Sequence, residues 1–295
     1  MTSGRSRVIC DQAKQAEIHF KHRFSCIETT ADKGIAAMHG RLEIQGGTVA
    51  MADRVQRTGN GEVSLRGARI TWLGHATVLV QTARGTNILI DPFIAQNPKY
   101  PKEFVLPAKI HYILLTHGHS DHISDALPVA AKHHSTVVAI YELAAYMAAK
   151  GAAHTIGMAL GGTVQLDDVA ATMVEAIHSS SAQDEKGTHY VGVAAGFVLT
   201  LTDGPVLYHA GDTAVFGDMK LIRELYRPEI VMLPIGGHYT MGPREAALAV
   251  RFLEPKIVLP LHYGTFPPLQ GTPEQLAALL DAGVQVAWLA PGESI

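Results

Sequence analysis

The residues with the clearest chemical potential lie in the segment Thr116–His122, which contains three histidines and one aspartate. Neutral imidazole and carboxylate are good ligands for zinc and similar divalent cations. The segment directly follows YILL, an apolar run of strand length, so His117 and His119 can point to the same side of the chain. Asp121 and His122 then follow in a turn and can face a second cation. The alternative, a polar loop with surface histidines, is disfavoured by this spacing behind a buried strand.

Two cations need more ligands than this segment offers, and three later polar residues are placed to supply them. Each of them lies at or just after the C-terminal end of a predicted strand. His178 ends ATMVEAIH, Asp212 follows VLYH, and His262 ends KIVLPLH. Each of them alone is compatible with an ordinary loop residue. Together they complete a ligand set for two divalent cations, so the sequence predicts a two-metal site.

Further residues are candidates to support this site. His75 follows the first predicted strand, in WLGHAT, and could either reach the cleft and contact substrate or satisfy a turn. Asp91 and Asp125 are both candidates to accept a hydrogen bond from the outer nitrogen of a ligand histidine. The alternative for Asp125 is the N-cap of a following helix, and the alternative for His209 is a core histidine. We assign four other histidines to the surface: His133, His134, His154 and His189.

A candidate substrate-binding segment lies where the predicted strand IVMLPI passes into a predicted helix that begins PREAA. It carries His238, Tyr239, Thr240 and Arg244. The free N–H groups of a first helical turn favour an anion, and a guanidinium suits phosphate or carboxylate. We therefore expect the substrate to carry an anionic group that binds here. The alternative is that the turn only caps the helix and that Arg244 points to solvent.

The chain from position 67 onward supplies the strands and helices that would position these residues. Apolar runs predict strands at 68–73, 77–82, 86–91, 112–116, 136–140, 171–178, 191–201, 206–209, 230–235, 256–262 and 284–290. Helix-forming composition and stop signals predict helices at 141–150, 218–226, 243–253 and 272–282. The polar stretch SSSAQDEKG (179–187) indicates a loop. This order, a run of strands followed by mixed strand–helix units, twice over, fits two sheets with helices outside them.

Residues 1–66 differ from the rest because they show no sustained helical or alternating period. We expect them to form an N-terminal extension, with residues 67–295 as the catalytic domain. Met51 begins a stretch that reads as a natural start, so we expect residues 1–50 to be disordered or to precede that start. The alternative is a true extension that covers the site or mediates assembly.

Composition excludes several classes of protein. The net charge of −3 gives no support for a nucleic-acid partner, which favours a basic surface. The two cysteines, Cys10 and Cys26, both lie early, which excludes a disulfide scaffold and a cysteine-ligated zinc site in the main domain. With no signal-like N-terminus and no membrane span in the sequence, we expect a cytoplasmic location. Whether the chain forms a homo-oligomer is left open.

The combined motifs resemble those of the metallo-β-lactamase fold superfamily. Within it, they resemble a bacterial metal-dependent hydrolase group related to ascorbate-phosphate lactonase and to the N-acyl-phosphatidylethanolamine phospholipase D. The resemblance runs from about position 68 to the C-terminus and rests on HGHSDH (117–122), WLGHAT (72–77), IDPF (90–93), YHAGDT (208–213), TMGP (240–243) and PLHYGTFP (260–267). These motifs are specific for fold and metal site and weak for substrate.

The resemblance implies an α/β fold, a four-layer αββα sandwich with the metals between the sheet edges. It implies that one metal is held by His117, His119 and His178, that the other is held by Asp121, His122 and His262, and that Asp212 bridges them. The histidine-rich set favours Zn²⁺, and some members use Mn²⁺ or Fe²⁺. A hydroxide held between the two cations would attack the substrate, with Asp121 orienting it.

The function expected on these grounds is hydrolysis of an ester, lactone or phosphodiester in a small-molecule or lipid-like substrate. A β-lactamase is disfavoured by Asp212, because the resemblance puts cysteine at that position in those enzymes. A tRNA-processing nuclease is disfavoured by the acidic net charge. The alternative from another class is a non-catalytic metal-binding or sensing module. The full ligand set argues against it, because structural zinc sites are closed with four ligands.

Overall fold

The computed structural model describes residues 64–295. The predictions for residues 1–50 and for Met51 therefore lie outside the described residues. Within the described part, no helix combines the length and the apolar character that crossing a membrane requires.

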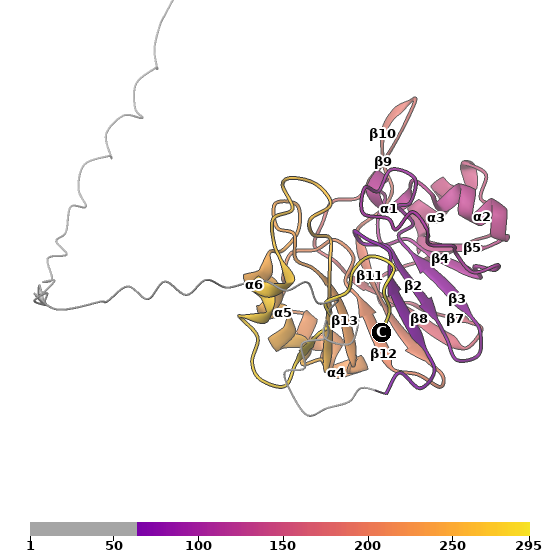
Figure 1. The fold of residues 1–295 in the computed structure, drawn as a ribbon. Helices are drawn as coiled ribbons and strands as arrows, with labels where there is room; N and C mark the ends of the chain where they lie inside the picture. The colour runs from indigo at the N-terminus through magenta and orange to yellow at the C-terminus, as the bar shows by residue number, and fades with distance from the viewer. Residues whose placement is uncertain (1–63) are drawn as a thin grey trace, which may run out of the picture. The chain divides into compact units, whose positions relative to one another are not determined.

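Two β-sheets lie face to face, and helices flank them on both outer sides (Figure 1). The first sheet has six strands in chain order: β1 (Arg69–Trp72), β2 (Val78–Gln81), β3 (Asn87–Ile90), β4 (Tyr112–Leu114), β5 (Thr136–Ile140) and β6 (Thr155–Met158). The second has seven, in the order β15 (Gln285–Val286), β14 (Ile257–Leu261), β13 (Ile230–Pro234), β12 (Val206–His209), β11 (Ala195–Leu201), β8 (Val169–Glu175) and β7 (Thr163–Leu166). This arrangement confirms the predicted αββα sandwich.

The helices belong to two groups. α1 (Ser120–Ile123), α2 (Ala126–His133) and α3 (Tyr141–Ala149) follow strands of the first sheet. α4 (Met219–Tyr226), α5 (Pro243–Leu253) and α6 (Pro273–Ala277) accompany the second. α5 begins and ends where the sequence predicts, because Pro243 at its first position and the left-handed Glu254 after its last residue define both ends.

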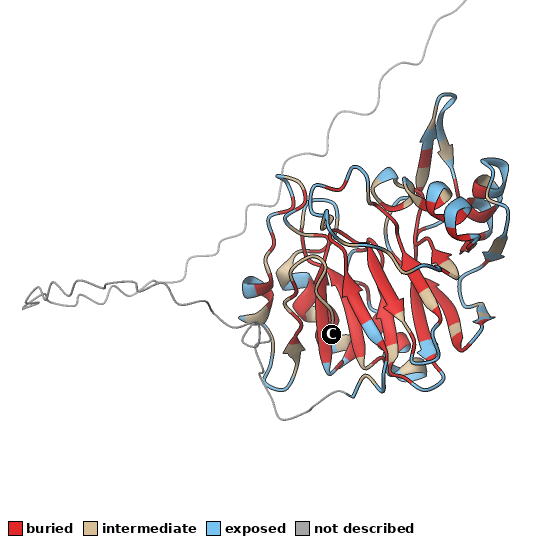
Figure 2. Ribbon diagram, turned by 45° about the vertical axis from the view of Figure 1, so that its right-hand side comes forward, coloured by how far each residue is buried: buried red, intermediate tan, exposed pale blue. Residues whose placement is uncertain are grey.

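Alternation of side chains along the second sheet separates two cores. In β13, Ile230 and Met232 pack into the core between the sheets, whereas Val231 and Leu233 pack against α4 and α5. Successive side chains of a strand point to opposite faces, so a sheet covered on both sides needs this continuous apolar pattern. Figure 2 shows the result, with the strands of the sandwich mostly buried along their length.

The C-terminal residues close one edge of the first sheet. The N–H of Ile70 donates to the carbonyl of Ile295 at 3.0 Å, and the N–H of Ile295 donates back to Ile70 at 3.0 Å. Thr71 and Ser294 share a hydrogen bond between their hydroxyls at 2.8 Å. β1 is therefore paired on both sides, with β2 and with the last residues of the chain.

One predicted strand that matters for function ends early. The sequence predicts a strand over 171–178, but β8 ends at Glu175. Beyond it, the N–H of Ile177 donates to the Thr213 hydroxyl at 3.0 Å in the loop after β12, so the chain leaves the sheet. His178 therefore lies in a loop and not at a strand end.

The predicted loop at 179–187 is also wrong in part, because a hairpin of β9 (Ser181–Asp184) and β10 (Gly187–Tyr190) forms there. It projects from the sandwich at the top of Figure 1. Side-chain contacts hold it: Asp184 accepts from Lys150 at 2.6 Å and contacts His189 at 2.8 Å. Its polar sequence lacks the apolar alternation that reveals a strand.

Other differences are smaller. β6 and β7 have no sequence prediction. Three predicted elements are shorter by four residues or more: the strand at 191–201 begins at Ala195, the helix at 272–282 covers Pro273–Ala277, and the last strand covers Gln285–Val286. His133, assigned to the surface, is buried and its Nδ1 lies 3.2 Å from the Ala108 carbonyl.

Close backbone approach at Gly236, just after β13, gives a test of how tightly the site-bearing loops pack. A Cβ there would lie 2.1 Å from the carbonyl oxygen of His262. We expect Gly236→Ala to lower the free energy of unfolding by about 2–3 kcal/mol through overpacking, which lowers the melting temperature by roughly 5–10 °C. Gly217→Ala is the matched control, because a Cβ there meets nothing within 4 Å. Equal melting temperatures for the two variants would contradict this packing.

Candidate metal centre

The segment after β4 delivers four candidate ligands to one end of the sandwich. His117 and His119 lie in the loop, and Asp121 and His122 lie on the short helix α1 instead of the predicted turn. Gly118 between them leaves no room for a side chain, since a Cβ would lie 2.4 Å from Val191. The loop therefore packs against the ends of the β9–β10 hairpin, and this contact limits the directions that its histidines can take.

The first group of candidate ligands consists of His117, His119 and His178. One ligand atom from each lies within 4.8 Å of the others. His117 Nε2 and His119 Nδ1 are 3.0 Å apart. The two loops that carry these residues are joined by the Ser180 hydroxyl, which accepts the N–H of Gly118 at 3.2 Å.

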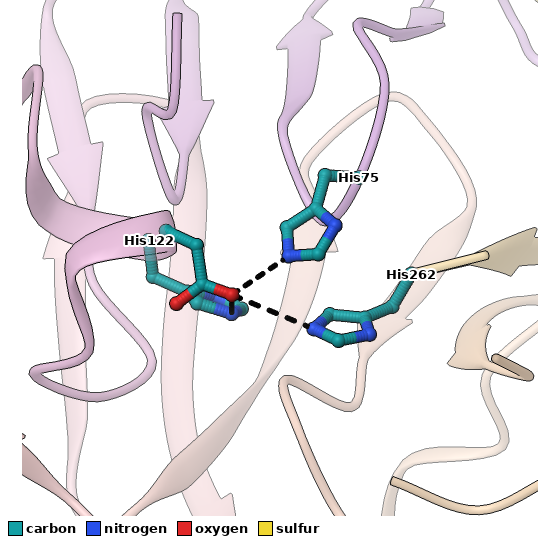
Figure 3. Close-up of side chains that lie close together, drawn as sticks. His75, His122 and His262 are labelled. Atoms are coloured by element: carbon teal, nitrogen blue, oxygen red, sulfur yellow. Dashed lines mark hydrogen bonds and ion pairs between the residues drawn. The ribbon is translucent and has the colours of Figure 1, made fainter. Parts of the chain in front are cut away.

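The second group consists of His75, Asp121, His122 and His262, again with ligand atoms within 4.8 Å. Figure 3 shows the three imidazoles converging on one carboxylate. Its oxygen, Oδ2 of Asp121, lies 3.0 Å from Nε2 of His75 and 3.9 Å from Nε2 of both His122 and His262. His122 and His262 therefore face Asp121 across a space of cation size.

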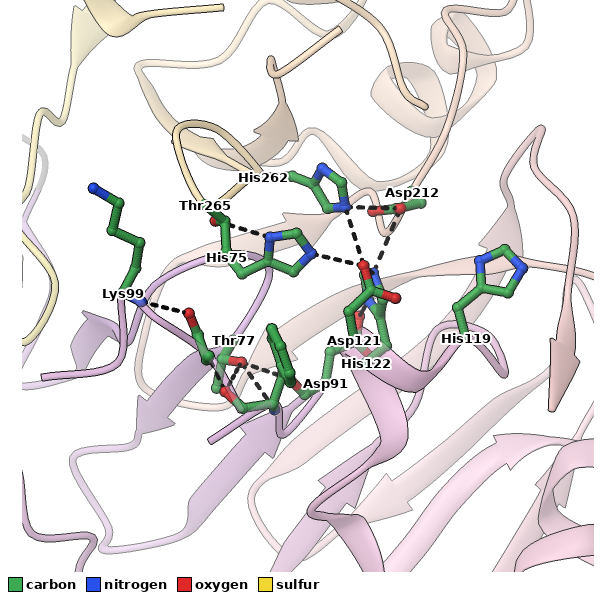
Figure 4. A network of polar contacts seen from close by, with 12 residues as sticks. His75, Thr77, Asp91, Lys99, His119, Asp121, His122, Asp212, His262 and Thr265 are labelled. Carbon is green, nitrogen blue, oxygen red and sulfur yellow. Dashed lines mark hydrogen bonds and ion pairs between the residues drawn. The ribbon is translucent and has the colours of Figure 1, made fainter. Parts of the chain in front are cut away.

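Asp212 lies between the two groups. Its Oδ2 is 3.0 Å from Nε2 of His262, 3.4 Å from Nε2 of His122 and 3.7 Å from Nε2 of His178. The first two of these belong to the second group and the third to the first group. Figure 4 shows the Asp212 carboxylate directed toward His262 and His122 of the second group. Its position is the one that a bridging ligand would occupy.

A buried carboxylate behind the site orients two of the candidate ligand histidines. Asp91 Oδ2 accepts from Nδ1 of His122 at 2.8 Å and from the Thr116 hydroxyl at 2.6 Å. The Thr116 oxygen in turn lies 3.0 Å from Nδ1 of His117. These contacts engage Nδ1 of His117 and His122, so it is Nε2 of each ring that lies among the other candidate ligands. Asp91 thus takes the role for which the sequence offered two candidates.

Asp125 has a different role. It stands at the N-cap of α2, but its side chain does not cap that helix. Its Oδ2 accepts the N–H groups of Ile94 at 2.7 Å and Ala95 at 3.2 Å. Asp125 therefore fixes the loop after Phe93 and contacts no ligand histidine through these bonds.

His75 is fully buried behind Asp121. Its Nε2 donates to Asp121, and its Nδ1 lies 3.0 Å from the hydroxyl of Thr265, a residue within PLHYGTFP that sequence reasoning did not single out. Burial and the neighbouring His262 lower the pKa of His75 to about 4, so the ring is neutral near pH 7. Contact of its side chain with substrate stays a prediction.

His209 is the core histidine that the sequence offered as one alternative. Its side chain is buried, with Nε2 donating to the Ala76 carbonyl at 3.0 Å and Nδ1 accepting the N–H of Gly211 at 3.1 Å. It therefore joins the loop after His75 to the loop that carries Asp212.

Burial and charge act in opposite directions across the site. Burial lowers the pKa of His117 well below its usual value, and it also lowers the pKa of His119 and of His178. Burial alone would lower the pKa of His122 too, but Asp212, Asp91 and Asp121 outweigh it and raise that pKa well above the usual value. The imidazoles of the first group are therefore neutral near pH 7, whereas three carboxylates favour a positive charge at His122.

The donor set fits divalent cations. His122 Nε2, His262 Nε2 and Asp212 Oδ1 are buried without a hydrogen-bond partner among the described residues. Unsatisfied buried polar atoms cost free energy, and here the two imidazole nitrogens lie 3.4 Å and 3.0 Å from Asp212 Oδ2. Metal ions bound between these groups would satisfy them.

The predicted substrate-binding residues lie on the loop between β13 and α5. His238, Tyr239 and Thr240 line a pocket beside the metal centre. Arg244 is exposed and does not line that pocket. The pocket instead includes Glu245, which sequence reasoning missed, although an acidic residue in a first helical turn is a usual capping signal.

The two-sheet sandwich, with its imidazoles and carboxylates gathered at one end, defines a metallo-β-lactamase fold. Residues 69–262 match the family described as the beta-lactamase superfamily domain. The chain is 47% identical over 232 residues to a UPF0173 metal-dependent hydrolase of Koribacter versatilis, which covers 79% of this chain and 99% of that relative. A UPF0173 metal-dependent hydrolase of Methanopyrus kandleri is 44% identical over 231 residues, covering 77% and 98%. The chain therefore belongs to the β-lactamase superfamily and, within it, to the UPF0173 metal-dependent hydrolase family.

Solved structures agree with this assignment. Igni18, a metallo hydrolase from Ignicoccus hospitalis, has a TM-score of 0.67 at 34% identity and covers 77% of this chain and 97% of its own. An isothiocyanate hydrolase from Delia radicum gut bacteria has a TM-score of 0.60 at 21% identity, covering 77% and 98%. At that identity the second likeness shows the fold alone.

The contacts of Asp91 predict a loss of metal affinity when its charge is removed. In Asp91→Asn, an amide N–H₂ would face the donors of Thr116 and His122, so the histidine would lose its fixed orientation. We expect affinity for Zn²⁺ to fall about 10- to 100-fold, measured by competition with a chromogenic chelator.

Asp125→Asn is the matched control for this measurement. Its carboxylate also accepts several hydrogen bonds, but from the backbone of Ile94 and Ala95. It should change stability and leave metal affinity within about twofold, well below the loss expected for an outer partner of a ligand. Similar affinity losses in both variants would show that Asp91 acts only through stability.

Proposed function

We propose that this chain is a hydrolase that uses two divalent metal ions, most simply Zn²⁺, to cleave an ester, lactone or phosphodiester bond. The observation that carries the proposal is the position of Asp212 Oδ2, within 3.0–3.7 Å of imidazoles from two separate ligand groups. A purely structural metal site would need one closed set of four ligands. Six candidate ligand side chains in addition to the Asp212 carboxylate exceed that need.

His117, His119 and His178 would hold one cation, and Asp121, His122 and His262 the other, with Asp212 shared. Cations bound there would act as Lewis acids that lower the pKa of a water molecule and polarise the bond to be cleaved. The chain's own contribution is to hold these groups in place, since buried Asp91 fixes the ring of His122 from behind.

Asp121 is the candidate for contact with the reacting groups. Its side chain is 29% exposed, whereas that of Asp212 is 4% exposed. The surrounding histidines hold the pKa of Asp121 below its usual range although burial acts against them, so it is ionised near pH 7 and can accept a hydrogen bond from the attacking water. The neutral ring of His75 donates to the same carboxylate and fixes its orientation.

Asp212→Ala tests the shared-ligand arrangement. We expect about two metal ions per chain in the natural sequence and fewer in the variant, measured by mass spectrometry of the metals after desalting. We expect turnover to fall by more than about 100-fold, the upper end of the loss caused by removing an outer partner of a ligand. The substrate panel should include lactones, carboxyl esters, phosphodiesters and lactams.

Two controls keep this test decisive. Asp203→Ala removes an exposed carboxylate that pairs with Arg84 on the surface, and it should leave metal content and turnover unchanged. Circular dichroism should show that Asp212→Ala is folded. One tightly bound ion in the natural chain, together with full turnover in Asp212→Ala, would refute the two-metal proposal.

A further inference from the structure

A pocket of about 260 Å³ opens beside the metal centre. It lies between the residues next to His178, those that follow Asp212, and the turn that begins α5. Its walls combine apolar and polar surface, with Ile177, Val215 and Met241 among the apolar lining residues. Ile177 is 49% exposed, so a large aliphatic side chain faces an open space next to a candidate ligand.

Backbone hydrogen bonds tie this pocket to the metal ligands. The N–H of Ala214 donates to the carbonyl of Ile177 at 3.1 Å, and the N–H of Met241 donates to the carbonyl of Thr213 at 3.0 Å. Ile177 directly precedes His178, and Thr213 directly follows Asp212. Residues of the pocket wall are therefore direct chain neighbours of two candidate metal ligands.

The charge of the pocket is opposite to the one that the sequence predicts. Glu245 is the one acidic residue among the lining residues, and neither lysine nor arginine is among them. The Oε2 of Glu245 accepts the N–H of Gly242 at 3.2 Å. The carboxylate thus occupies the first turn of α5, where an anionic substrate group was expected to bind.

The arginine that was expected to bind the anionic group is also not part of the pocket wall. Arg244 is exposed and lies outside the lining. The rings of His238 and Tyr239 instead pack edge to face with centroids 4.3 Å apart. Tyr239 is 58% exposed and adds aromatic surface to the pocket. Aromatic and aliphatic walls with one carboxylate suit an apolar group that carries a positive charge or none.

We propose that this pocket binds the non-reacting part of the substrate, and that it selects an apolar group that is cationic or neutral and rejects an anionic one. Glu245 is the residue that sets the charge preference. This inference rests on the proposed hydrolase function for its biological meaning, and it replaces the anionic substrate group expected from the sequence.

Three six-carbon probes test the charge preference: hexylammonium, hexanol and hexanesulfonate, which share the apolar tail. Binding is measured by ligand-observed nuclear magnetic resonance on the full-length, metal-loaded protein. We expect hexylammonium to bind best and hexanesulfonate worst. In Glu245→Gln, hexylammonium should bind about two- to fivefold more weakly and hexanol should bind as before, because an exposed charge pair contributes a modest amount.

Glu245→Gln keeps an oxygen that can accept the Gly242 N–H, so the helix cap survives while the charge is lost. Glu224→Gln on α4 is the matched control, because it removes the same charge from an exposed position that does not line the pocket. Tighter binding of hexanesulfonate than of hexylammonium, or equal shifts for all three probes in Glu245→Gln, would overturn the proposal.

Turnover separates this inference from the proposed function. Hexylammonium should inhibit competitively whichever substrate of the panel is hydrolysed, since both would need the same space. Inhibition that is not competitive would overturn the role of the pocket and leave the metal chemistry standing. Charge-selective probe binding in a chain that hydrolyses nothing would leave the pocket's preference standing and refute the hydrolase.

Discussion

A single carboxylate, that of Asp212, joins the two halves of the sandwich. It contacts His122, which follows a strand of the first sheet, and His262, which follows a strand of the second. Burying ionised groups costs several kcal/mol for each group unless opposite charges offset one another. The imidazoles of His122, His178 and His262 offset the charge of the buried Asp212 carboxylate where the strand ends meet, and bound cations would add to that balance.

The backbone shares in the positioning. His75, Asp91 and His262 all have left-handed conformations, with φ of 57°, 47° and 55°. Such conformations cost on the order of 1–3 kcal/mol each for residues other than glycine and persist where the surroundings fix them. Here the N–H of His262 donates to the carbonyl of His75 at 2.9 Å, and the N–H of Asp91 donates to Leu114 at 3.0 Å. The loops are held by each other, so the side chains arrive with their directions set.

Local sequence patterns predicted much of this molecule. The spacing of HGHSDH behind an apolar strand, and single polar residues after later strands, were enough to select the side chains that the fold gathers. They were not enough to place His178, because its strand is cut short by a contact with Thr213 that lies far along the chain. The choice between Asp91 and Asp125 likewise depends on which carboxylate faces His122 in space. The hairpin at 181–190 is held by Lys150, from another element, and so left no periodic signal.

The same dependence on contacts in space explains why the Glu245 carboxylate lies at the first turn of α5, where the sequence predicted an anionic substrate group. The first turn of a helix favours a negative charge, which can come from a bound anion or from an acidic side chain in the same turn. Glu245 lies three residues after Gly242, so its own carboxylate can accept the Gly242 N–H without an external anion. A motif that predicts anion binding must therefore be checked for an acidic residue within the same turn.

The pairing of the C-terminal residues with β1 affects how this protein meets copies of itself. An unpaired edge strand exposes a row of N–H and C=O groups to which another chain can add, which is a common route to aggregation. In this chain the backbone of Ile295 pairs with the N–H and C=O groups of Ile70, so the last residues of the sequence cover this edge. Proteolytic trimming of the last few residues would uncover an edge that favours self-association while leaving the candidate metal ligands in place.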